Sequence, residues 1–170
     1  MPHVYTSDAY SPSQIAAKVE AVGVRKANAR FTETFMLGTL AGGFIGLGAL
    51  FFTFIQADAS LNPTVARLVG GLFFAVGYLI AILAGAELFT SNNLFAMAVA
   101  AHKITFRQLC RNWVIVLVAN TVGAVGLVVL FLLSGLHREM DGAVGAVAYE
   151  IGASKIALPP LEAWWASFIT

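Results

Sequence analysis

Hydrophobic residues dominate three long stretches of the chain, and two of these have the length of a membrane-spanning helix. Residues 35–55 and residues 113–133 contain no charged side chain, and each stretch has 21 residues. As α-helices they reach about 31 Å, which matches a hydrocarbon core of about 30 Å. We therefore predict one membrane span in each.

The third stretch, residues 68–101, is too long for one span and is interrupted by polar residues. Its 34 residues would form a helix of about 51 Å, longer than a bilayer accommodates even with tilt. The block AGAELFTSNN at residues 84–93 places a carboxylate, a threonine, a serine and two asparagines between two apolar pieces. We predict one broken membrane span, with a second half-helix that begins near Leu94.

The N-terminal part predicts an amphipathic helix over residues 11–30. SPSQ at residues 11–14 has the order of a helix start, with serine as N-cap, proline at the first helical position and glutamine at the third. Ile15, Val19 and Val22 then share one face. Such a helix is expected to lie on the membrane surface.

A polar segment, residues 102–112, precedes the span at 113–133. Thr105 and Gln108 have the spacing of a capping box, so a short basic surface helix is predicted there. Trp113 at the start of the span is typical of an interfacial anchor.

The C-terminal part consists of a connection and the start of another helix. Residues 134–155 predict a polar, glycine-rich connection, and residues 161–170 predict the start of a fourth membrane span. Trp164 and Trp165 would lie near its interface.

Glycines in the first span predict a close helix contact. Gly38, Gly42 and Gly46 are spaced by four and therefore share one helix face. Small residues on one face let another membrane helix approach closely.

Composition places the chain among integral membrane proteins of the all-α class. Hydrophobic residues make up 59% and charged residues 11%, against about 25% charge in a soluble domain. The net charge of +1 gives no reason to expect a nucleic-acid partner. The single cysteine, Cys110, excludes an internal disulfide and a multi-cysteine metal site.

Charge distribution predicts the orientation of the chain. Basic residues concentrate in two segments, before the first span (Lys18, Arg25, Lys26, Arg30) and before the third (Lys103, Arg107, Arg111). The positive-inside rule places both segments, and with them the N-terminus, in the cytoplasm. The broken span then crosses from outside to inside.

A broken helix at membrane depth is a candidate substrate site, because irregular backbone in lipid is tolerated only where protein buries it or where it lines a polar cavity. Glu87 is an intramembrane carboxylate, for which a functional role is the default. The alternative, which we favour, is that it accepts hydrogen bonds from loop amides, because a fixed negative charge would repel an anion. Asn120, in the middle of the third span, is expected to bridge helices or hold the loop.

Five motifs, in this order, resemble landmarks of the formate/nitrite transporter family: VGVRKA, LAGGFIGLG, ILAGAELFTS, ITFRQLCRNW and ANTVGA. The resemblance covers roughly residues 11–170, and GAELFTS is its most specific part. It implies an aquaporin-like helical bundle with a broken second transmembrane helix, assembled as a homo-pentamer with one pore in each protomer. It also implies passage of small monovalent anions of weak acids, with or without a proton, across a bacterial inner membrane.

The resemblance also implies site residues. Phe74, Tyr78 and Phe89 would form apolar constrictions, Thr90 and Ser91 would face the pore from the loop, and Lys155 would lie near the outer vestibule. The family often has leucine where this chain has Tyr78. From the residues alone, ordinary helix packing explains Phe74 and Tyr78, and a solvated loop lysine explains Lys155.

Family members continue through a second broken helix with a pore histidine, which the 170 residues do not contain. The chain is therefore expected to be the front part of a longer protein or a truncated form, and not to form the pore alone. A neutral-solute channel and a non-transporting assembly subunit are the alternatives. An enzyme is not expected, because the sequence shows no nucleophile–base pair, metal-ligand cluster or phosphate-binding loop; no cofactor or metal is expected either.

Overall fold

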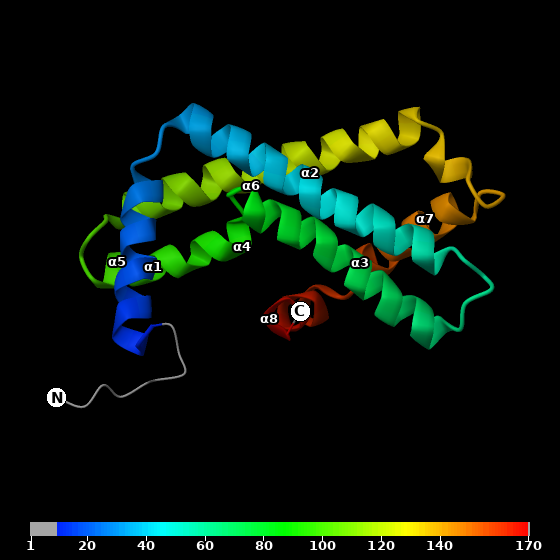
Figure 1. Cartoon of the computed structure of the whole chain (residues 1–170), viewed down its shortest axis with the longest axis horizontal. Helices are drawn as coiled ribbons and strands as arrows, with labels where there is room; N and C mark the ends of the chain where they lie inside the picture. Colours follow the sequence, from blue (N-terminus) through cyan, green and yellow to red (C-terminus); the bar gives the residue numbers. More distant parts are fainter. Residues whose placement is uncertain (1–9, 170) are drawn as a thin grey trace. The chain divides into compact units, whose positions relative to one another are not determined.

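The computed structural model describes residues 10–169, and within them all secondary structure is helical (Figure 1). In chain order the helices are α1 (Pro12–Ala27), α2 (Phe31–Gln56), α3 (Pro63–Leu83), α4 (Phe89–Asn92), the 3-10 helix η1 (Asn93–Phe95), α5 (Ala96–Ala100), α6 (Phe106–Leu133), the 3-10 helix η2 (Leu136–Arg138), α7 (Ala143–Ile156) and α8 (Pro160–Ile169). Thr170, the last residue of the predicted fourth span, lies outside the described residues.

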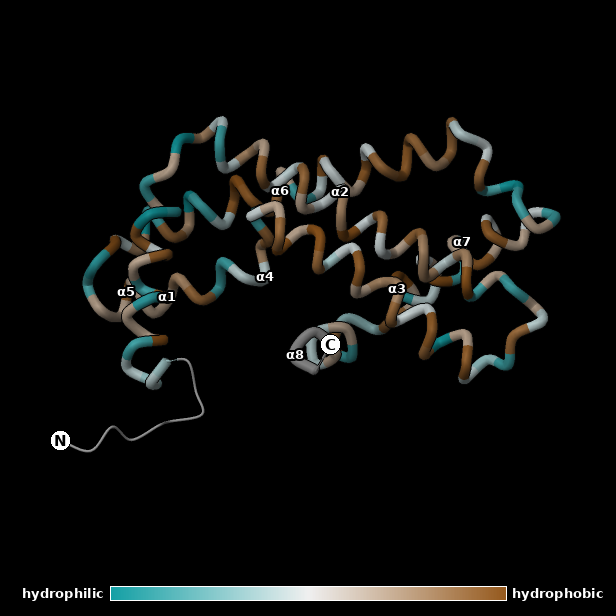
Figure 2. Tube along the Cα trace, viewed as in Figure 1, coloured by the Kyte–Doolittle hydropathy of each residue, from teal (hydrophilic) through white to brown (hydrophobic). Residues whose placement is uncertain are grey.

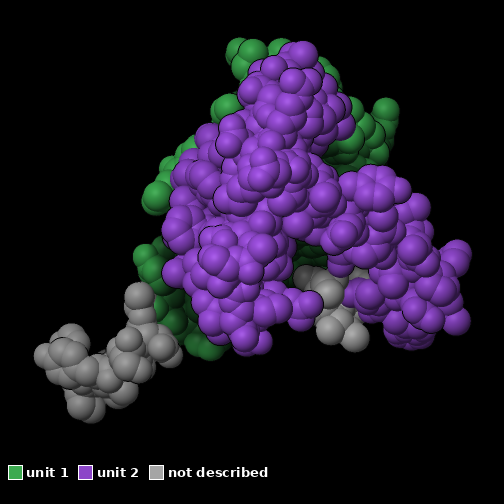
Figure 3. Space-filling view, turned by 90° about the vertical axis from the view of Figure 1, so that its right-hand side faces the viewer, with its two compact units in different colours: residues 1–43, 81–124 green, residues 44–80, 125–170 purple. Residues whose placement is uncertain are grey.

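Helices α2, α3 and α6 are the three in this described part that are long and apolar enough to cross a membrane. Figure 2 shows apolar residues along most of these helices and polar residues at the turns that join them. The chain divides into two compact units, coloured in Figure 3. Unit 1 comprises Met1–Gly43 and Ala81–Ala124, and unit 2 comprises Phe44–Ile80 and Val125–Thr170.

Helix α1 begins in unit 1 with the predicted capping box. The Ser11 hydroxyl accepts a hydrogen bond from the backbone amide of Gln14, and the Gln14 side chain accepts one from the Ser11 amide at 2.8 Å. These bonds satisfy amides that the first helical turn leaves without a partner. The helix ends at Ala27 rather than at residue 30.

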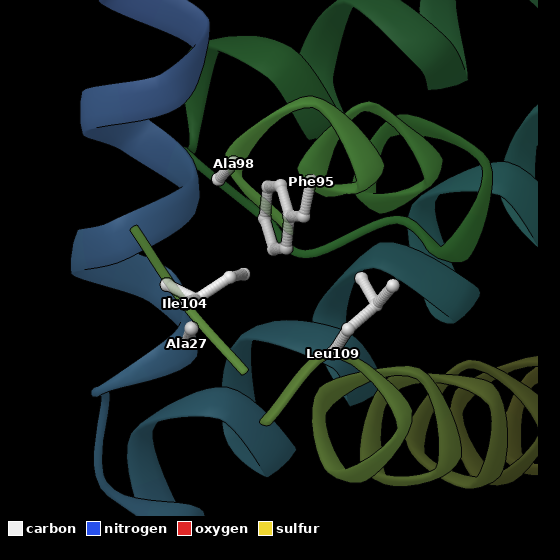
Figure 4. Close-up of a cluster of buried hydrophobic side chains, with 5 residues drawn as sticks. All are labelled: Ala27, Phe95, Ala98, Ile104 and Leu109. Carbon is white, nitrogen blue, oxygen red and sulfur yellow. The ribbon is translucent and has the colours of Figure 1, made fainter. Parts of the chain in front are cut away.

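The core of unit 1 joins α1, the helical run 89–100 and the start of α6. Five buried side chains form it: Ala27, Phe95, Ala98, Ile104 and Leu109. Figure 4 shows them converging from these separate elements. Burial of this apolar surface holds α1 against α5, and the two helices lie side by side in Figure 1.

The predicted short surface helix over residues 102–112 is wrong. Its capping box is present, because the Gln108 side chain accepts from the Thr105 amide at 2.8 Å, but the helix that starts there is α6, which continues without interruption to Leu133. No proline or turn signal separates residue 108 from residue 113, so the helix simply propagates. Trp113 therefore lies in the third turn of α6.

The predicted glycine contact in α2 is confirmed. In unit 1, a Cβ added to Gly38 would lie 2.7 Å from the Cβ of Ala119, and one added to Gly42 would overlap the backbone carbonyl of Asn120. In unit 2, a Cβ on Gly46 would lie 2.7 Å from the Leu127 side chain. All three glycines thus face α6, and the two backbones approach closely because no side chain separates them.

Helix α3 begins earlier than predicted, at Pro63. The Asn62 side chain accepts a hydrogen bond from the Thr64 amide at 2.9 Å, and proline occupies the first helical position. This combination of an asparagine cap and a first-turn proline is a strong helix start. The 21 residues of α3 reach about 31 Å.

Unit 2 contains a helix where a polar connection was predicted. Residues 143–156 form α7, and Val144 is fully buried with Ala57 and Phe131 in the core of this unit. Val144 and Val147, which build this face, have a helical spacing. The glycines at 142, 145 and 152 obscured that pattern in the sequence.

The close contact of α2 with α6 predicts a position-specific response to a methyl group. Gly42→Ala should lower the stability of the folded protein by about 1–3 kcal/mol, because the new Cβ would push the Asn120 backbone away. Gly43→Ala is the matched control, since a Cβ there meets nothing within 4 Å. Thermal unfolding in detergent would measure both, and equal melting temperatures for the two variants would contradict the contact.

Candidate functional site

The helix break at residues 84–88 begins with a defined helix stop. Gly85 has φ +66°, a left-handed conformation that glycine adopts without strain. Its amide donates to the Ile82 carbonyl at 3.0 Å, and the Ala86 amide donates to the Ala81 carbonyl at 2.9 Å. This is the Schellman pattern, which satisfies the last carbonyls of α3.

The Asn120 side chain from α6 replaces the backbone hydrogen bonds that the break removes. Its amide nitrogen donates to the carbonyl oxygens of Gly38 and Glu87, both at 2.8 Å, and its oxygen accepts from the Phe89 amide at 3.0 Å. The Glu87 amide donates to the Leu37 carbonyl at 3.2 Å. One side-chain amide thus ties the break to α2 and α6.

The break lies halfway along α6. Asn120 is the fifteenth of the 28 residues of α6, counted from Phe106. From this level the helical run 89–100 follows α6 back toward its start, because Asn92 bonds to Asn112 and Phe95 packs with Leu109. The polar residues of the break are therefore placed at the middle of a helix long enough to span a membrane.

The Glu87 carboxylate is buried and paired. The residue is 5% exposed, and one carboxylate oxygen lies 2.9 Å from Nζ of Lys26 on α1. The other oxygen accepts from the Asn92 side chain at 2.8 Å. Its partners are thus a cation and a side-chain amide rather than the loop amides expected from the sequence, and the charge of the carboxylate is compensated locally.

Asn92 connects the carboxylate to α6. It is fully buried, and its side-chain nitrogen also donates to the Asn112 oxygen at 2.9 Å. The indole nitrogen of Trp113 donates to the Asn92 carbonyl at 3.1 Å, and the Trp113 ring meets Phe89 edge to face. Trp113, predicted as an interfacial anchor, therefore packs against the break.

The chain becomes helical again at Phe89, five residues earlier than the predicted Leu94. Thr90 and Ser91, next in α4, are both exposed. The Ser91 hydroxyl donates to the Leu88 carbonyl at 2.9 Å. Amides in the first turn of a helix have no acceptor within that helix, so this exposed turn offers backbone donors together with the Thr90 hydroxyl.

The remaining predicted site residues, Phe74, Tyr78 and Lys155, belong to unit 2. Phe74 and Tyr78 are one turn apart on α3 and are 38% and 46% exposed. Phe74 lines a cavity of about 350 Å³ together with Ile151 of α7. Lys155 is exposed one turn beyond Ile151, in the last turn of α7.

A small polar cavity of about 150 Å³ adjoins the break within unit 1. Its charged lining consists of two cations and two carboxylates, from Arg25, Lys26, Glu33 and Glu87. The balanced charges suit water rather than a bound anion. Within residues 10–169 no group of three histidine, cysteine or acidic side chains is arranged to hold a metal ion.

Sequence reasoning missed four residues of this site, Lys26, Gly85, Asn92 and Asn112. A glycine directly after an apolar helical run is a recognisable stop signal, so Gly85 could have been found. The pairing of Lys26 with Glu87 could not, because 61 positions separate them in the sequence and only the fold of α1 over the break brings them together.

Comparisons with known proteins agree with this arrangement. A family model described as formate/nitrite transporter matches residues 13–169. The chain is 34% identical over 157 residues to the formate channel FocA of Escherichia coli (strain K12), covering 92% of this chain and 55% of that protein. It is 37% identical over 120 residues to the formate channel BtFdhC of Bacillus thuringiensis, covering 68% of this chain and 46% of that protein.

Two solved structures have similar folds. One, an FNT family ion channel, matches with a TM-score of 0.77 at 23% identity over 86% of this chain and 59% of that one. The other, a pentameric formate channel with formate bound, matches with a TM-score of 0.68 at 29% identity over 78% of this chain and 52% of that one. The chain spans about half the length of the curated relatives that it matches. The named relatives are channels, and together with the three apolar helices they identify an integral membrane protein.

The hydrogen bonds of Asn120 predict a strong effect of an apolar replacement. Asn120→Leu keeps the number and branching of the side-chain heavy atoms but leaves the Phe89 amide and the Glu87 carbonyl without their partner. Each unsatisfied buried group costs about 1–3 kcal/mol, so folded yield and melting temperature should fall sharply. Thr121→Val is the control, because the exposed Thr121 hydroxyl bonds only to the Leu117 carbonyl of its own helix. Equal behaviour of the two variants would show that the break is held by other contacts.

The Lys26–Glu87 pair predicts non-additive stability. Glu87→Gln and Lys26→Met should each destabilise the protein, because each leaves one buried or half-buried partner uncompensated. The double variant should lose less than the sum of the two single losses. Chemical unfolding of all four proteins gives the coupling energy. Strictly additive losses would mean that the two charges do not interact.

Proposed function

We propose, since this chain belongs to the formate/nitrite transporter family, that it contributes the path for small monovalent anions of weak acids, such as formate or nitrite. The two named relatives carry the name formate channel, and the chain covers 55% and 46% of them. Transport would be passive or coupled to a proton.

The observation that carries this proposal is the exposed turn at the helix break. The Thr90 hydroxyl and the backbone amides of Thr90 and Ser91 offer donors next to the level of Asn120, halfway along α6. Hydrogen-bond donors at a helix break within a membrane suit an anionic substrate. The paired Glu87 favours the same substrate, because Lys26 compensates a charge that would otherwise repel it.

The path would combine apolar constrictions with these donors. Transfer of a carboxylate-sized ion into a low-dielectric region has an idealised cost of order 20 kcal/mol. We assign Phe74, Tyr78 and Phe89 to the constrictions and Thr90 and Ser91 to the polar relay. Transient protonation removes the charge of a weak acid but not that of chloride, so the apolar lining favours weak acids. Exposed Lys155 would gather the anion at the entrance.

The assembly and orientation belong to the same proposal. A homo-pentamer is supported by the solved channel whose title calls it pentameric. A cytoplasmic N-terminus is supported by unit 1, whose described residues carry seven lysines and arginines but three glutamates. The bacterial relatives favour a bacterial inner membrane.

Flux measurements on the full-length protein test the function. In liposomes it should take up formate, and Thr90→Val should slow uptake roughly ten- to hundredfold, the effect expected for losing a hydrogen bond to a charged group. Thr121→Val, an equal change at an exposed hydroxyl satisfied within its own helix, should transport normally. Passage of glycerol but not formate would favour a neutral-solute channel. A correctly assembled protein with no flux would favour an assembly subunit.

A further inference from the structure

The outward face of α6 carries two arginines followed by an apolar stripe. Arg107 and Arg111 are exposed and lie one turn apart. Val114 and Val118 continue the same face and are 62% and 50% exposed. The opposite face packs inside unit 1, where Leu109 is 2% exposed. The arginines therefore stand at the end of an apolar strip that points away from the core of the unit.

The two arginines have no counter-charge in the part of the chain that the structure describes. The two ion pairs found there use Lys26 and Lys103, and neither arginine donates a side-chain hydrogen bond to another described residue. Like charges one helical turn apart destabilise a helix, and cations in its first turns oppose its dipole. Helix α6 has no acidic residue in its first turn to offset this. An external anion would relieve both effects.

We infer that this face of α6 binds an anionic phospholipid, with the phosphate between Arg107 and Arg111 and an acyl chain along Val114 and Val118. Guanidinium groups form paired hydrogen bonds with phosphate oxygens. Phe106, 65% exposed beside the arginines, is a side chain suited to the membrane interface. The two arginines also lie at a suitable depth for lipid phosphates, because arginines at the end of a membrane span reach the head-group layer.

Charge favours a lipid over a second copy of this chain. In a ring of copies around an axis normal to the membrane, this end of one unit meets the same end of its neighbour. Unit 1 is cationic there, with basic residues outnumbering acidic ones, so the copies repel. Glu33, exposed in the first turn of α2, is the one acidic side chain of the described part of unit 1 outside the two ion pairs.

The inference goes beyond the proposed function and requires only that the protein lies in a membrane. Native mass spectrometry of the full-length protein with equal amounts of phosphatidylglycerol and phosphatidylcholine tests it. The wild type should retain phosphatidylglycerol preferentially. Each basic residue near a lipid surface is worth about a fivefold factor, so Arg107→Gln with Arg111→Gln should weaken retention roughly thirtyfold. Arg107→Lys with Arg111→Lys keeps the charge but not the paired hydrogen-bond geometry. Its retention of phosphatidylglycerol should lie between that of the wild type and that of the glutamine variant.

The control is Arg67→Gln with Arg138→Gln, which removes two exposed charges from unit 2 and should leave the lipid preference unchanged. Soluble glycerol phosphate should not displace the lipid, because it lacks the acyl chain that the valines bind. Unchanged phosphatidylglycerol retention in the glutamine variant, an equal loss in the control, or displacement by glycerol phosphate would each overturn the inference. The inference would also be overturned if the glutamine variant dissociated from its oligomer but still bound the lipid. That result would mean that the arginines pair with Glu33 of a neighbouring copy.

Discussion

The structure depends on how a helix can be interrupted in a medium that offers no hydrogen bonds. Backbone groups left without partners in hydrocarbon cost several kcal/mol each. Here a single side chain, that of Asn120, satisfies such groups with three hydrogen bonds, one to α2 and one to each side of the break. Gly85 closes α3, and Asn92 with Glu87 fixes the start of the next helical run.

This way of holding the break leaves one turn free. The groups at Glu87 and Phe89 are turned inward and satisfied, whereas Thr90 and Ser91 remain exposed with donors available. The ion pair with Lys26 compensates the negative charge of Glu87, which would otherwise repel an anion from this turn. The same ion pair connects the break to α1, which the sequence predicts to lie on the membrane surface. A structural network and a proposed anion relay therefore occupy adjacent residues without competing for the same groups.

The sequence predicted those features that depend on local pattern. Charge-free runs of 21 residues pointed to the two long apolar helices α2 and α6, and glycine spacing identified the face of α2 that meets α6. Prediction from the sequence failed where tertiary contacts determine the local structure. The helix α7 was hidden by its glycines, because burial of Val144 rather than helix propensity stabilises it. The partners of Glu87 could not be predicted from the sequence either, because the tertiary fold decides which groups lie next to a buried carboxylate.

Hydrogen–deuterium exchange of the full-length protein in lipid nanodiscs tests most directly whether side chains hold the break. The amides of Glu87 and Phe89 donate to Leu37 and Asn120, so their exchange should be slow, like that of amides within α2. The amides of Thr90 and Ser91, exposed in the first turn of α4, should exchange at least about a hundredfold faster, since opening a protected amide requires local unfolding. A single common rate for all four amides would contradict the account, because the break would then be a mobile loop without fixed partners.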